Sequence, residues 1–283
     1  MLMNTKVILI TGCSSGIGFD TVFALKKRGH RVIASCRKTV DVQKLLSKGI
    51  EALLLDVSDT TSIQSAFAQL LIMTSGRLDI LINNAGYGQI GALEDISRNT
   101  LRQQFETNVF GLHELTNLAI PIMRQQGEGR IINISSILGL ISMPFRGAYN
   151  SSKYALEGMS DTLRLELSGS GIKVITIEPG PIRSQFRDNA VDFSLQQIEI
   201  EKSYFKSQYK AMLSSFKQKK ESSFFTQDTG AVIKKLIHAI ESKKPQPKYP
   251  VTTAAHFLIG LKRFLSTRFL DKVILFLSRK ELS

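Results

Sequence analysis

The stretch V-I-L-I-T-G-C-S-S-G-I-G, residues 7–18, predicts the fold of this 283-residue chain. Val7 to Ile10 form a short apolar run suited to a buried strand, and Phe19 to Lys27 show a helical pattern. The glycine-rich turn between them would place free amide groups and the positive end of a helix dipole against a phosphate. The stretch therefore predicts a phosphate-binding strand–turn–helix unit, with a plain glycine turn as the alternative.

Short apolar runs and helical segments keep alternating as far as Pro179, which predicts an α/β fold with a doubly wound parallel sheet, Rossmann-type and in a single domain. Strands are expected near residues 6–11, 31–35, 51–55, 79–83, 130–134 and 173–178. Helices are expected near 17–28, 40–48, 60–75, 99–125 and 148–169.

The chain after Pro179 has a different organisation. A polar and aromatic segment at 184–226 precedes a helix near 228–242, a Pro-rich connector at 245–247 and a helical pair after Thr252. We therefore divide the chain into a Rossmann-type domain at 1–250, with 184–226 as its variable part, and a basic amphipathic helical extension at 251–283.

Tyr149 and Lys153 stand four residues apart and would share one face of a helix. A phenol has an ordinary pKa of about 10, and a neighbouring ammonium group lowers it by favouring the phenolate. The pair is therefore a candidate acid/base device. An ordinary surface helix is the alternative, because this spacing is common.

Polar residues follow the predicted strands at their carboxyl ends, where a doubly wound sheet binds ligands. Asp56 follows the third strand, Asn83-Asn84-Ala85-Gly86 the fourth, Ser135 and Ser136 the fifth, and Pro179-Gly180 the sixth. Asn108 falls inside the long helix after the fourth strand, where a polar side chain is mildly unfavourable.

Together these residues resemble the short-chain dehydrogenase/reductase family, in its Tyr-dependent single-domain branch. The glycine spacing is Gly-x-x-x-Gly-x-Gly, and the matching pieces follow the family's order over about residues 5–185. The likeness extends to bacterial NADP-linked oxidoreductases related to retinol and hydroxysteroid dehydrogenases.

The resemblance implies roles for four catalytic residues. Tyr149 would exchange a proton with the substrate oxygen, and Ser136, thirteen residues before it, would bind the same oxygen. Lys153 would lower the pKa of Tyr149 and hold the nicotinamide ribose, and Asn108 would position a water beside Lys153. Structural roles in capping or backbone hydrogen bonding are the alternative for Asn108 and Ser136.

The expected cofactor is NADP(H) rather than NAD(H). NAD-using relatives carry an acidic residue where Cys36 stands, and Arg37 beside it offers a planar donor fork for a 2′-phosphate. The residues expected to bind the cofactor are Gly12, Ser14, Ser15, Gly16, Ile17, Gly18, Arg37, Asp56, Val57, Asn84, Ala85, Gly86, Tyr149, Lys153, Pro179, Gly180, Ile182 and Ser184.

Eight aromatic residues after Pro179 predict an apolar lid over the active site, with packing in a core as the alternative. They are Phe186, Phe193, Tyr204, Phe205, Tyr209, Phe216, Phe224 and Phe225. The expected activity is NADP(H)-dependent interconversion of a hydrophobic aldehyde or ketone and its alcohol. A catalytically silent NADP(H)-binding regulator is the alternative, which the presence of all four catalytic residues disfavours.

Composition bounds the remaining classes of function. Cys13 and Cys36 are the only cysteines, so we expect a reducing compartment, and oxidation of either thiol is a hypothesis for blocking the cofactor site. The four histidines show no metal-ligand spacing. Met1 to Thr5 is too short for a signal peptide, and no apolar run is long enough to span a membrane. We expect a cytoplasmic protein.

The formal net charge of +13 is concentrated in the last third, where residues 201–283 hold 17 Lys+Arg and 6 Asp+Glu. No nucleic-acid recognition motif accompanies the charge, so we expect no nucleic-acid partner. In the tail 254–283 an apolar helical stripe is expected, made of Leu258, Leu261, Leu265, Phe269, Val273 and Phe276. Two interpretations stay open for it: packing on the body or a second subunit, or peripheral contact with the inner face of a membrane. By resemblance we expect a homodimer or homotetramer.

Overall fold

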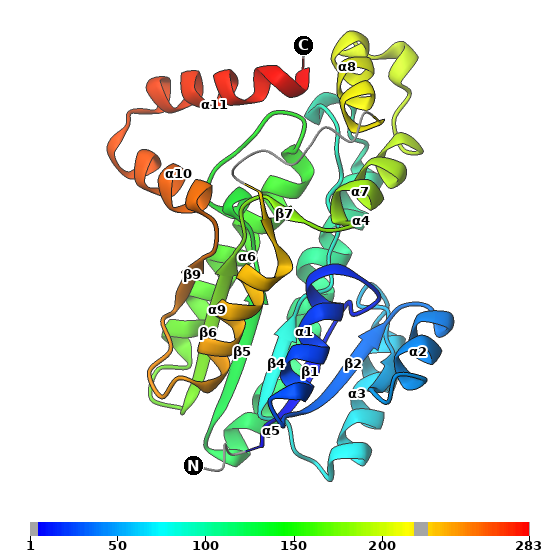
Figure 1. Cartoon of the computed structure of the whole chain (residues 1–283), viewed down its shortest axis with the longest axis vertical. Helices are drawn as coiled ribbons and strands as arrows, with labels where there is room; N and C mark the ends of the chain where they lie inside the picture. Colours follow the sequence, from blue (N-terminus) through cyan, green and yellow to red (C-terminus); the bar gives the residue numbers. More distant parts are fainter. Residues whose placement is uncertain (1–4, 218–225, 283) are drawn as a thin grey trace.

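A seven-stranded sheet, in which every adjacent pair of strands is parallel, forms the centre of the computed structural model (Figure 1), which describes residues 5–217 and 226–282. The strand order is β3-β2-β1-β4-β5-β6-β9. The strands are β1 (Val7–Ile10), β2 (Arg31–Cys36), β3 (Glu51–Leu54), β4 (Ile80–Asn83), β5 (Gly129–Ile134), β6 (Ile172–Glu178) and β9 (Lys248–Pro250). The predicted doubly wound sheet and its first six strands are confirmed.

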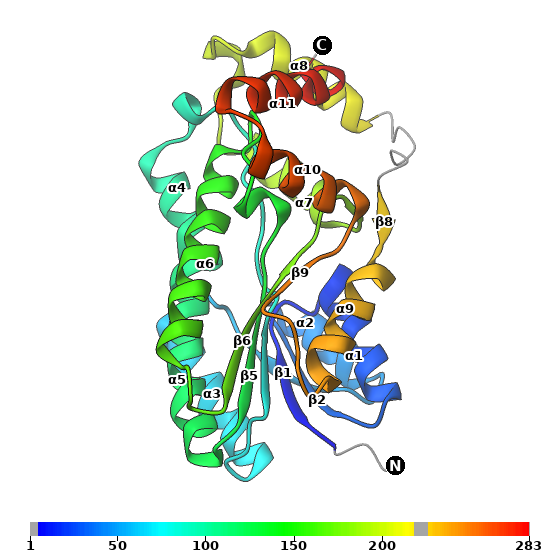
Figure 2. The ribbon, with the colours of Figure 1, turned by 90° about the vertical axis from the view of Figure 1, so that its left-hand side faces the viewer.

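Helices cover both faces of this sheet, which is why β1 is buried on both sides. Ile8 and Ile10 face one apolar layer, and Val7 and Leu9 face the other. The first layer is covered by α1 (Gly16–Lys27), α2 (Thr39–Leu46) and α9 (Thr229–Glu241). The second is covered by α3 (Thr60–Thr74), α5 (Gly111–Gln126) and α6 (Gly147–Glu166). Figure 2 shows α1 and α9 on the opposite side of the sheet from α3, α5 and α6.

The helix expected at 99–125 is interrupted in its middle. Helix α4 (Arg98–Phe105) passes through one π-helical turn at Glu106–Phe110 before α5 begins. A π turn inserts one extra residue into the helical repeat, and such turns are frequent at functional sites. Here the turn holds Asn108, which is fully buried.

Strand β9 was not predicted. It begins directly after the Pro-rich connector and pairs with β6 in the register Thr176↔Lys248. The amide of Thr176 also donates to the carbonyl oxygen of Pro247 at 2.9 Å. The strand has three residues and ends in a proline, so its sequence carries no strand pattern, and its partner strand alone makes it extended.

The rest of the chain lies beyond the carboxyl ends of the strands (Figure 1). It comprises β7 (Ile182–Arg183), α7 (Phe186–Leu195), a 3₁₀ turn at Ile200–Lys202, α8 (Lys206–Lys217), β8 (Gln227–Asp228), α10 (Thr253–Phe264) and α11 (Thr267–Leu282). β7 and β8 form a separate two-stranded sheet. The predicted final helical pair is present, and α10 and α11 break at residues 265–266.

Candidate active site

Two glycines, one in the turn after β1 and one in the first turn of α1, are required by close contacts. Gly12 has a φ of +70°, and a Cβ there would lie 2.7 Å from the Cα of Ala85. A Cβ on Gly18 would lie 2.5 Å from both the side-chain nitrogen of Asn84 and the carbonyl oxygen of Gly12. The turn therefore packs directly against the end of β4, and larger residues would push the two apart.

Hydrogen bonds fix the same contact. The hydroxyl of Thr11 accepts from the amides of Asn84 and Ala85 at 3.0 and 2.9 Å. The side-chain amide of Asn84 donates to the carbonyl oxygens of Thr11 and Gly12 at 2.8 and 2.9 Å. Asn84 thus holds the turn in place. Thr11 belongs to this site although it was not predicted; its signal was a hydroxyl residue directly after a buried strand.

The start of α1 suits a phosphate group. Its N-cap residue, Ser15, is extended and makes no side-chain capping bond, and the first turn contains no acidic residue. The first amides of the helix are therefore left for a ligand, and the dipole favours an anion there. Ser14 is exposed, and Gly16 and Ile17 are half-buried beside it. These residues fit the pyrophosphate of a dinucleotide.

The neighbouring strands β2 and β3 end next to each other, where the adenosine end of such a cofactor is expected. Arg37 follows β2 and is exposed, and no carboxylate pairs with it among the residues that the structure describes. One carboxylate oxygen of Asp56 accepts from the amide and hydroxyl of Ser58 at 2.9 and 2.6 Å. A Cβ on Gly111 would lie 1.5 Å from the carbonyl oxygen of Val57, so α5 approaches the segment after β3 without any gap.

Ser136 and Tyr149 meet at the carboxyl end of β5. Ser136 caps a 3₁₀ turn at Ile137–Gly139, where its hydroxyl accepts from the amide of Leu138 at 3.1 Å and lies 3.4 Å from the carbonyl oxygen of Pro179. Burial raises the pKa of Tyr149 to about 12, and a hydrogen bond with Ser136 lowers it. The hydroxyl groups of Ser136 and Tyr149 therefore lie within hydrogen-bond distance of each other.

Lys153 lies one helical turn beyond Tyr149 and is equally buried. Its ammonium group lies 5.7 Å from the centroid of the Tyr149 ring and donates to the carbonyl oxygen of Ile134 at 2.7 Å. Burial lowers the pKa of Lys153 to about 8, and the charge of Glu157 opposes that change. The lowering of the Tyr149 pKa by Lys153 stays a prediction.

Asn108 is brought to the same place by the π turn. Its side chain exchanges two hydrogen bonds with the backbone of Tyr87, at 3.1 and 3.0 Å, and donates to Ser152 at 3.1 Å. A Cβ on Gly86 would lie 3.1 Å from the Asn108 oxygen and 3.9 Å from the Lys153 nitrogen. Gly86, Asn108 and Lys153 are therefore neighbours, and the water that Asn108 would position beside Lys153 stays a prediction.

The segment after β6 folds back over this site. A Cβ on Gly16 would touch Ser184 at 3.4 Å, and the ring of Phe186 lies 5.7 Å from that of Tyr149. On its other side the segment meets α10, because a Cβ on Gly180 would lie 2.1 Å from the hydroxyl oxygen of buried Thr252. Pro179, Gly180, Ile182 and Ser184 thus connect the phosphate turn to the C-terminal helices. Thr252 was not predicted.

Of the aromatic residues in 184–226, some lie at the site, as expected for a lid, and others pack in a core. Phe186 and Phe193 contact Tyr149 and Tyr87 at the site, with ring centroids 5.7 and 4.9 Å apart. Tyr209 is a core residue, whose hydroxyl donates to Asp95 at 2.8 Å and accepts from the amide of Ala92 at 2.7 Å. Phe205 packs on Phe145 and Tyr204 is exposed. The side chains of Phe216, Phe224 and Phe225 lie outside the described residues.

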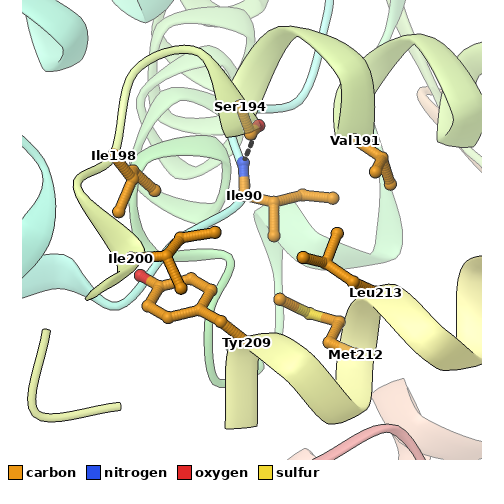
Figure 3. A pocket seen from close by; sticks show the side chains of 8 residues that line it. All are labelled: Ile90, Val191, Ser194, Ile198, Ile200, Tyr209, Met212 and Leu213. Carbon is orange, nitrogen blue, oxygen red and sulfur yellow. Dashed lines mark hydrogen bonds between the residues drawn. The ribbon is translucent and has the colours of Figure 1, made fainter. Parts of the chain in front are cut away.

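Figure 3 shows how that core joins α7 and α8. Tyr209, Met212 and Leu213 from α8 face Val191 and Ser194 of α7, and Ile90 lies between them. The amide of Ile90 donates to the hydroxyl of Ser194 at 2.7 Å. The space left is about 10 Å³, room for a single water at most. This cavity is a packing defect too small for a substrate.

A larger cleft of about 370 Å³ opens beside the start of α6. It is mainly apolar and is lined by Ala92, Leu93, Glu94, Met143, Pro144, Phe145, Gly147 and Phe205. Gly147 stands two residues before Tyr149, so the cleft lies close to the reacting groups. Its walls come from the loop after β4, the loop after β5 and the variable segment.

Both cysteines are buried, which disfavours the thiol hypothesis. Burial raises the pKa of the Cys13 thiol far above its ordinary value and that of Cys36 to about 11. A protonated, inaccessible thiol reacts slowly with oxidants and alkylating reagents. The interpretation as two small core side chains is therefore preferred. Among the described residues there is also no cluster of metal-binding side chains, and no helix has the length and apolar character needed to cross a membrane.

Comparison with known proteins finds relatives that cover most of the chain. A family model described as short chain dehydrogenase matches residues 6–194. The uncharacterized oxidoreductase YbbO of Escherichia coli is 44% identical, over 95% of this chain and 94% of its own length. A 3-ketodihydrosphingosine reductase of Bacteroides thetaiotaomicron is 41% identical, over 66% of this chain and 68% of its own.

Solved structures share the whole architecture. A short-chain dehydrogenase from Streptomyces avermitilis has a TM-score of 0.76 and 30% identity, covering 98% of this chain and 97% of its own. A Burkholderia phymatum protein in complex with NAD has a TM-score of 0.77 and 24% identity, covering 93% and 94%. The latter shows the fold alone, and the fold does not select between NAD and NADP.

Proposed function

The chain belongs to the short-chain dehydrogenase family, and from that premise we propose that it interconverts a hydrophobic aldehyde or ketone and its alcohol with NADP(H). The observation that carries the proposal is the hydrogen bond between Ser136 and Tyr149 at the carboxyl end of β5. Two hydroxyl groups can hold one substrate oxygen there, and one of them can exchange a proton with it. NADP(H), when bound, supplies or accepts the hydride.

The protein's own contribution is orientation and proton transfer. In reduction, Tyr149 donates its phenolic proton to the carbonyl oxygen while Ser136 donates a hydrogen bond to the same atom. In oxidation, Tyr149 accepts the proton of the alcohol. Lys153 stabilises the phenolate that reduction leaves behind, since an ammonium near a phenolate favours the charged form. Asn108 holds the backbone of Tyr87, after β4, and the hydroxyl of Ser152, which precedes Lys153 in α6.

The residues fit the cofactor in this structure. The glycine turn and the uncapped start of α1 would hold its pyrophosphate, and Asp56 and Val57 would border its adenine. Arg37 supports NADP(H) over NAD(H), because its guanidinium is exposed at the end of β2 where a 2′-phosphate would lie. Cys36, which stands where an acid would repel that phosphate, is neutral as well as buried.

The substrate's apolar body is assigned to the cleft of about 370 Å³ beside Gly147. Its volume is within the range of small-molecule sites, and its lining is largely hydrophobic. Phe186 and Phe193 would cover the reacting end. The name of the Bacteroides relative, a 3-ketodihydrosphingosine reductase, also supports a keto substrate.

The test is a panel of aldehydes and ketones of increasing chain length, followed through NADPH absorbance, with Tyr149→Phe beside the wild type. We expect turnover with long-chain substrates, a preference over short hydrophilic ones, and a loss of at least about 10³-fold in the variant. NADPH binding, followed by its fluorescence, should stay within a few-fold. If the wild type binds NADPH and turns over no carbonyl or alcohol, the regulatory alternative holds.

We also propose that the protein is a homodimer or homotetramer formed through the helices after β4 and β5. Phe110 at the end of the π turn and Tyr154 and Leu165 on α6 are large exposed hydrophobic side chains on these helices. Light scattering of the purified protein, with Leu165→Glu as an interface variant, measures the assembly directly.

A further inference from the structure

The C-terminal helices α10 and α11 form one end of the molecule. Both views place α11 beyond the carboxyl ends of the sheet, at the opposite end from the N-terminus (Figures 1 and 2). Only part of their apolar surface is used in packing. Ala255 and Ile274 are buried against Ile137 and Ile141 of the loop after β5, and α11 also packs on α8.

The other side of each helix exposes phenylalanine. Phe257 and Phe264 of α10 are 60% and 85% exposed, and Phe269 and Phe276 of α11 are 61% and 69% exposed. Leu275 and Leu277 are exposed beside them. With roughly 200 Å² for each phenylalanine, the four rings leave about 500 Å² of apolar surface in water. Four exposed phenylalanines on two consecutive helices exceed the single scattered apolar side chains of an ordinary surface, and such a concentration of apolar area usually marks an interaction surface.

Basic side chains border these rings. Lys262 and Arg263 follow on α10, and Arg268 and Lys272 stand in the first turns of α11, all exposed. The ammonium group of Lys272 lies 5.6 Å from the centroid of the Phe269 ring. Within the described ranges no carboxylate pairs with Arg263, Arg268 or Lys272. Six basic and two acidic residues give the stretch 254–283 a net charge of +4.

We propose that α10 and α11 dock the protein on an anionic phospholipid membrane. Phenylalanine rings can enter the boundary between headgroups and acyl chains, and Lys and Arg remain at the level of the anionic headgroups. A second copy of the same surface fits less well, because it would oppose two segments of net +4. The docking surface is independent of the proposed reaction.

The docking surface also lies close to the active site. Lys262 donates to the carbonyl oxygen of Leu140 and lies 3.2 Å from the hydroxyl of Tyr154. The start of α10 is held by Thr252 against Gly180. A membrane bound to these helices therefore lies next to the loop after β5, from which an apolar substrate could pass into the cleft without crossing bulk water.

The experiment is co-sedimentation of the full chain with vesicles of phosphatidylcholine alone and of phosphatidylcholine mixed with phosphatidylglycerol. We expect binding to the anionic vesicles that weakens as salt is raised. Phe269→Ala/Phe276→Ala should weaken binding about tenfold or more, and so should Arg268→Glu/Lys272→Glu. Deletion of the helices is avoided, because Thr252 and Ala255 are buried in the body.

Matched controls lie far from the docking surface. Ile72→Ala removes a side chain of α3 that is 81% exposed, and Lys27→Glu/Lys48→Glu reverses two exposed charges; neither should alter vesicle binding. Sedimentation velocity without lipid completes the test. Absent binding, or equal binding to neutral vesicles, overturns the proposal. So does a change of oligomeric state in the Phe269/Phe276 variant with vesicle binding unchanged, which would make the surface a contact between copies.

Discussion

The ammonium group of Lys153 donates a hydrogen bond to the carbonyl oxygen of Ile134, at 2.7 Å, inside a fully buried site. Burial lowers the pKa of Lys153 from 10.5 to about 8, so at neutral pH the folded protein holds a charge that the unfolded chain holds more easily. Burying the Lys153 ammonium group therefore lowers the stability of the folded protein, and the proposed role of Lys153 in the reaction would explain why the residue is there.

Replacing Lys153 by Met should therefore separate stability from activity. We expect Lys153→Met to be more stable than the wild type by about 1–2 kcal/mol at pH 7, while turnover falls by orders of magnitude. A base with a lowered folded pKa makes wild-type stability rise with pH between about 8 and 10.5, so the advantage of the variant should shrink there. Urea unfolding from pH 6.5 to 10 measures both effects; a constant difference would contradict the assignment.

Ser136 and its neighbour Ser135 form a matched pair. The Ser136 hydroxyl caps the 3₁₀ turn and faces Tyr149, whereas the Ser135 hydroxyl is buried with no hydrogen-bond partner in the described residues. Ser136→Ala should lower kcat about 10²–10³-fold and stability by about 1 kcal/mol. Ser135→Ala should leave kcat within about twofold and stability unchanged or slightly higher. Equal effects on kcat would remove the role given to Ser136.

Arg37 is predicted to select the cofactor. Arg37→Ala should raise the KM for NADPH by about 30–100-fold and leave the KM for NADH almost unchanged, because only NADPH carries the 2′-phosphate. Lys38→Ala, which removes an adjacent exposed charge, is the control and should change the NADPH value less than threefold. Titration of NADPH fluorescence provides the same comparison without a substrate. A large loss of NADPH affinity in the Lys38 variant alone would mean that Lys38, and not Arg37, contacts the 2′-phosphate.

Two helical glycines have opposite surroundings. A Cβ on Gly111 would lie 1.5 Å from the Val57 carbonyl oxygen, whereas nothing lies within 4 Å of a Cβ on Gly158. Gly111→Ala should cost at least about 3 kcal/mol or prevent folding. Gly158→Ala should stabilise by about 0.5–1 kcal/mol, since alanine loses less backbone entropy in a helix. Chemical unfolding of both variants decides the matter; a stable Gly111→Ala would mean that α5 can shift away from β3.

Glu178, at the end of β6, should make stability depend on pH. Burial and the charge of Glu157 raise the pKa of Glu178 from 4.5 to about 7. The folded state therefore binds more protons than the unfolded chain in this window, and stability falls as pH rises from 4.5 through 7. Between pH 5 and 8 the wild type should lose about 2–3 kcal/mol more than Glu178→Gln. Glu166→Gln, at an exposed position, should follow the wild type.

The sequence predicted those parts of the fold in which the residue pattern of the segment itself indicates whether it is buried. The six predicted strands contain apolar runs, and all of them except β3 are mostly buried on both faces, so composition alone reveals them; β1 is the clearest case. Strand β9 has no such pattern because pairing with β6 makes it extended. The π turn was also missed, because the helical pattern of 98–126 continues through it and one inserted residue leaves no separate signal.

The site shows the same division. Tyr149 and Lys153 were proposed from their spacing and Asn108 from a polar residue in a helix interior, whereas Ser136 was selected through the family resemblance. Gly111 and Thr252 were not found, since each is defined by a contact with a distant segment, at Val57 and Gly180, that no local pattern encodes. The aromatic residues after Pro179 could not be sorted from sequence, because Phe186 and Tyr209 differ only in which neighbour the fold gives them.

The register Thr176↔Lys248 has a consequence for biosynthesis. The ribosome releases β6 long before Lys248 emerges. While residues 184–226 are translated, β6 is therefore an edge strand whose backbone groups lack the partner that β9 later provides. An unpaired edge strand can pair with strands of other nascent chains. Truncated products that end before Lys248 would keep β6 as an unpaired edge strand. We expect them to aggregate or to be degraded, although they contain every predicted catalytic residue.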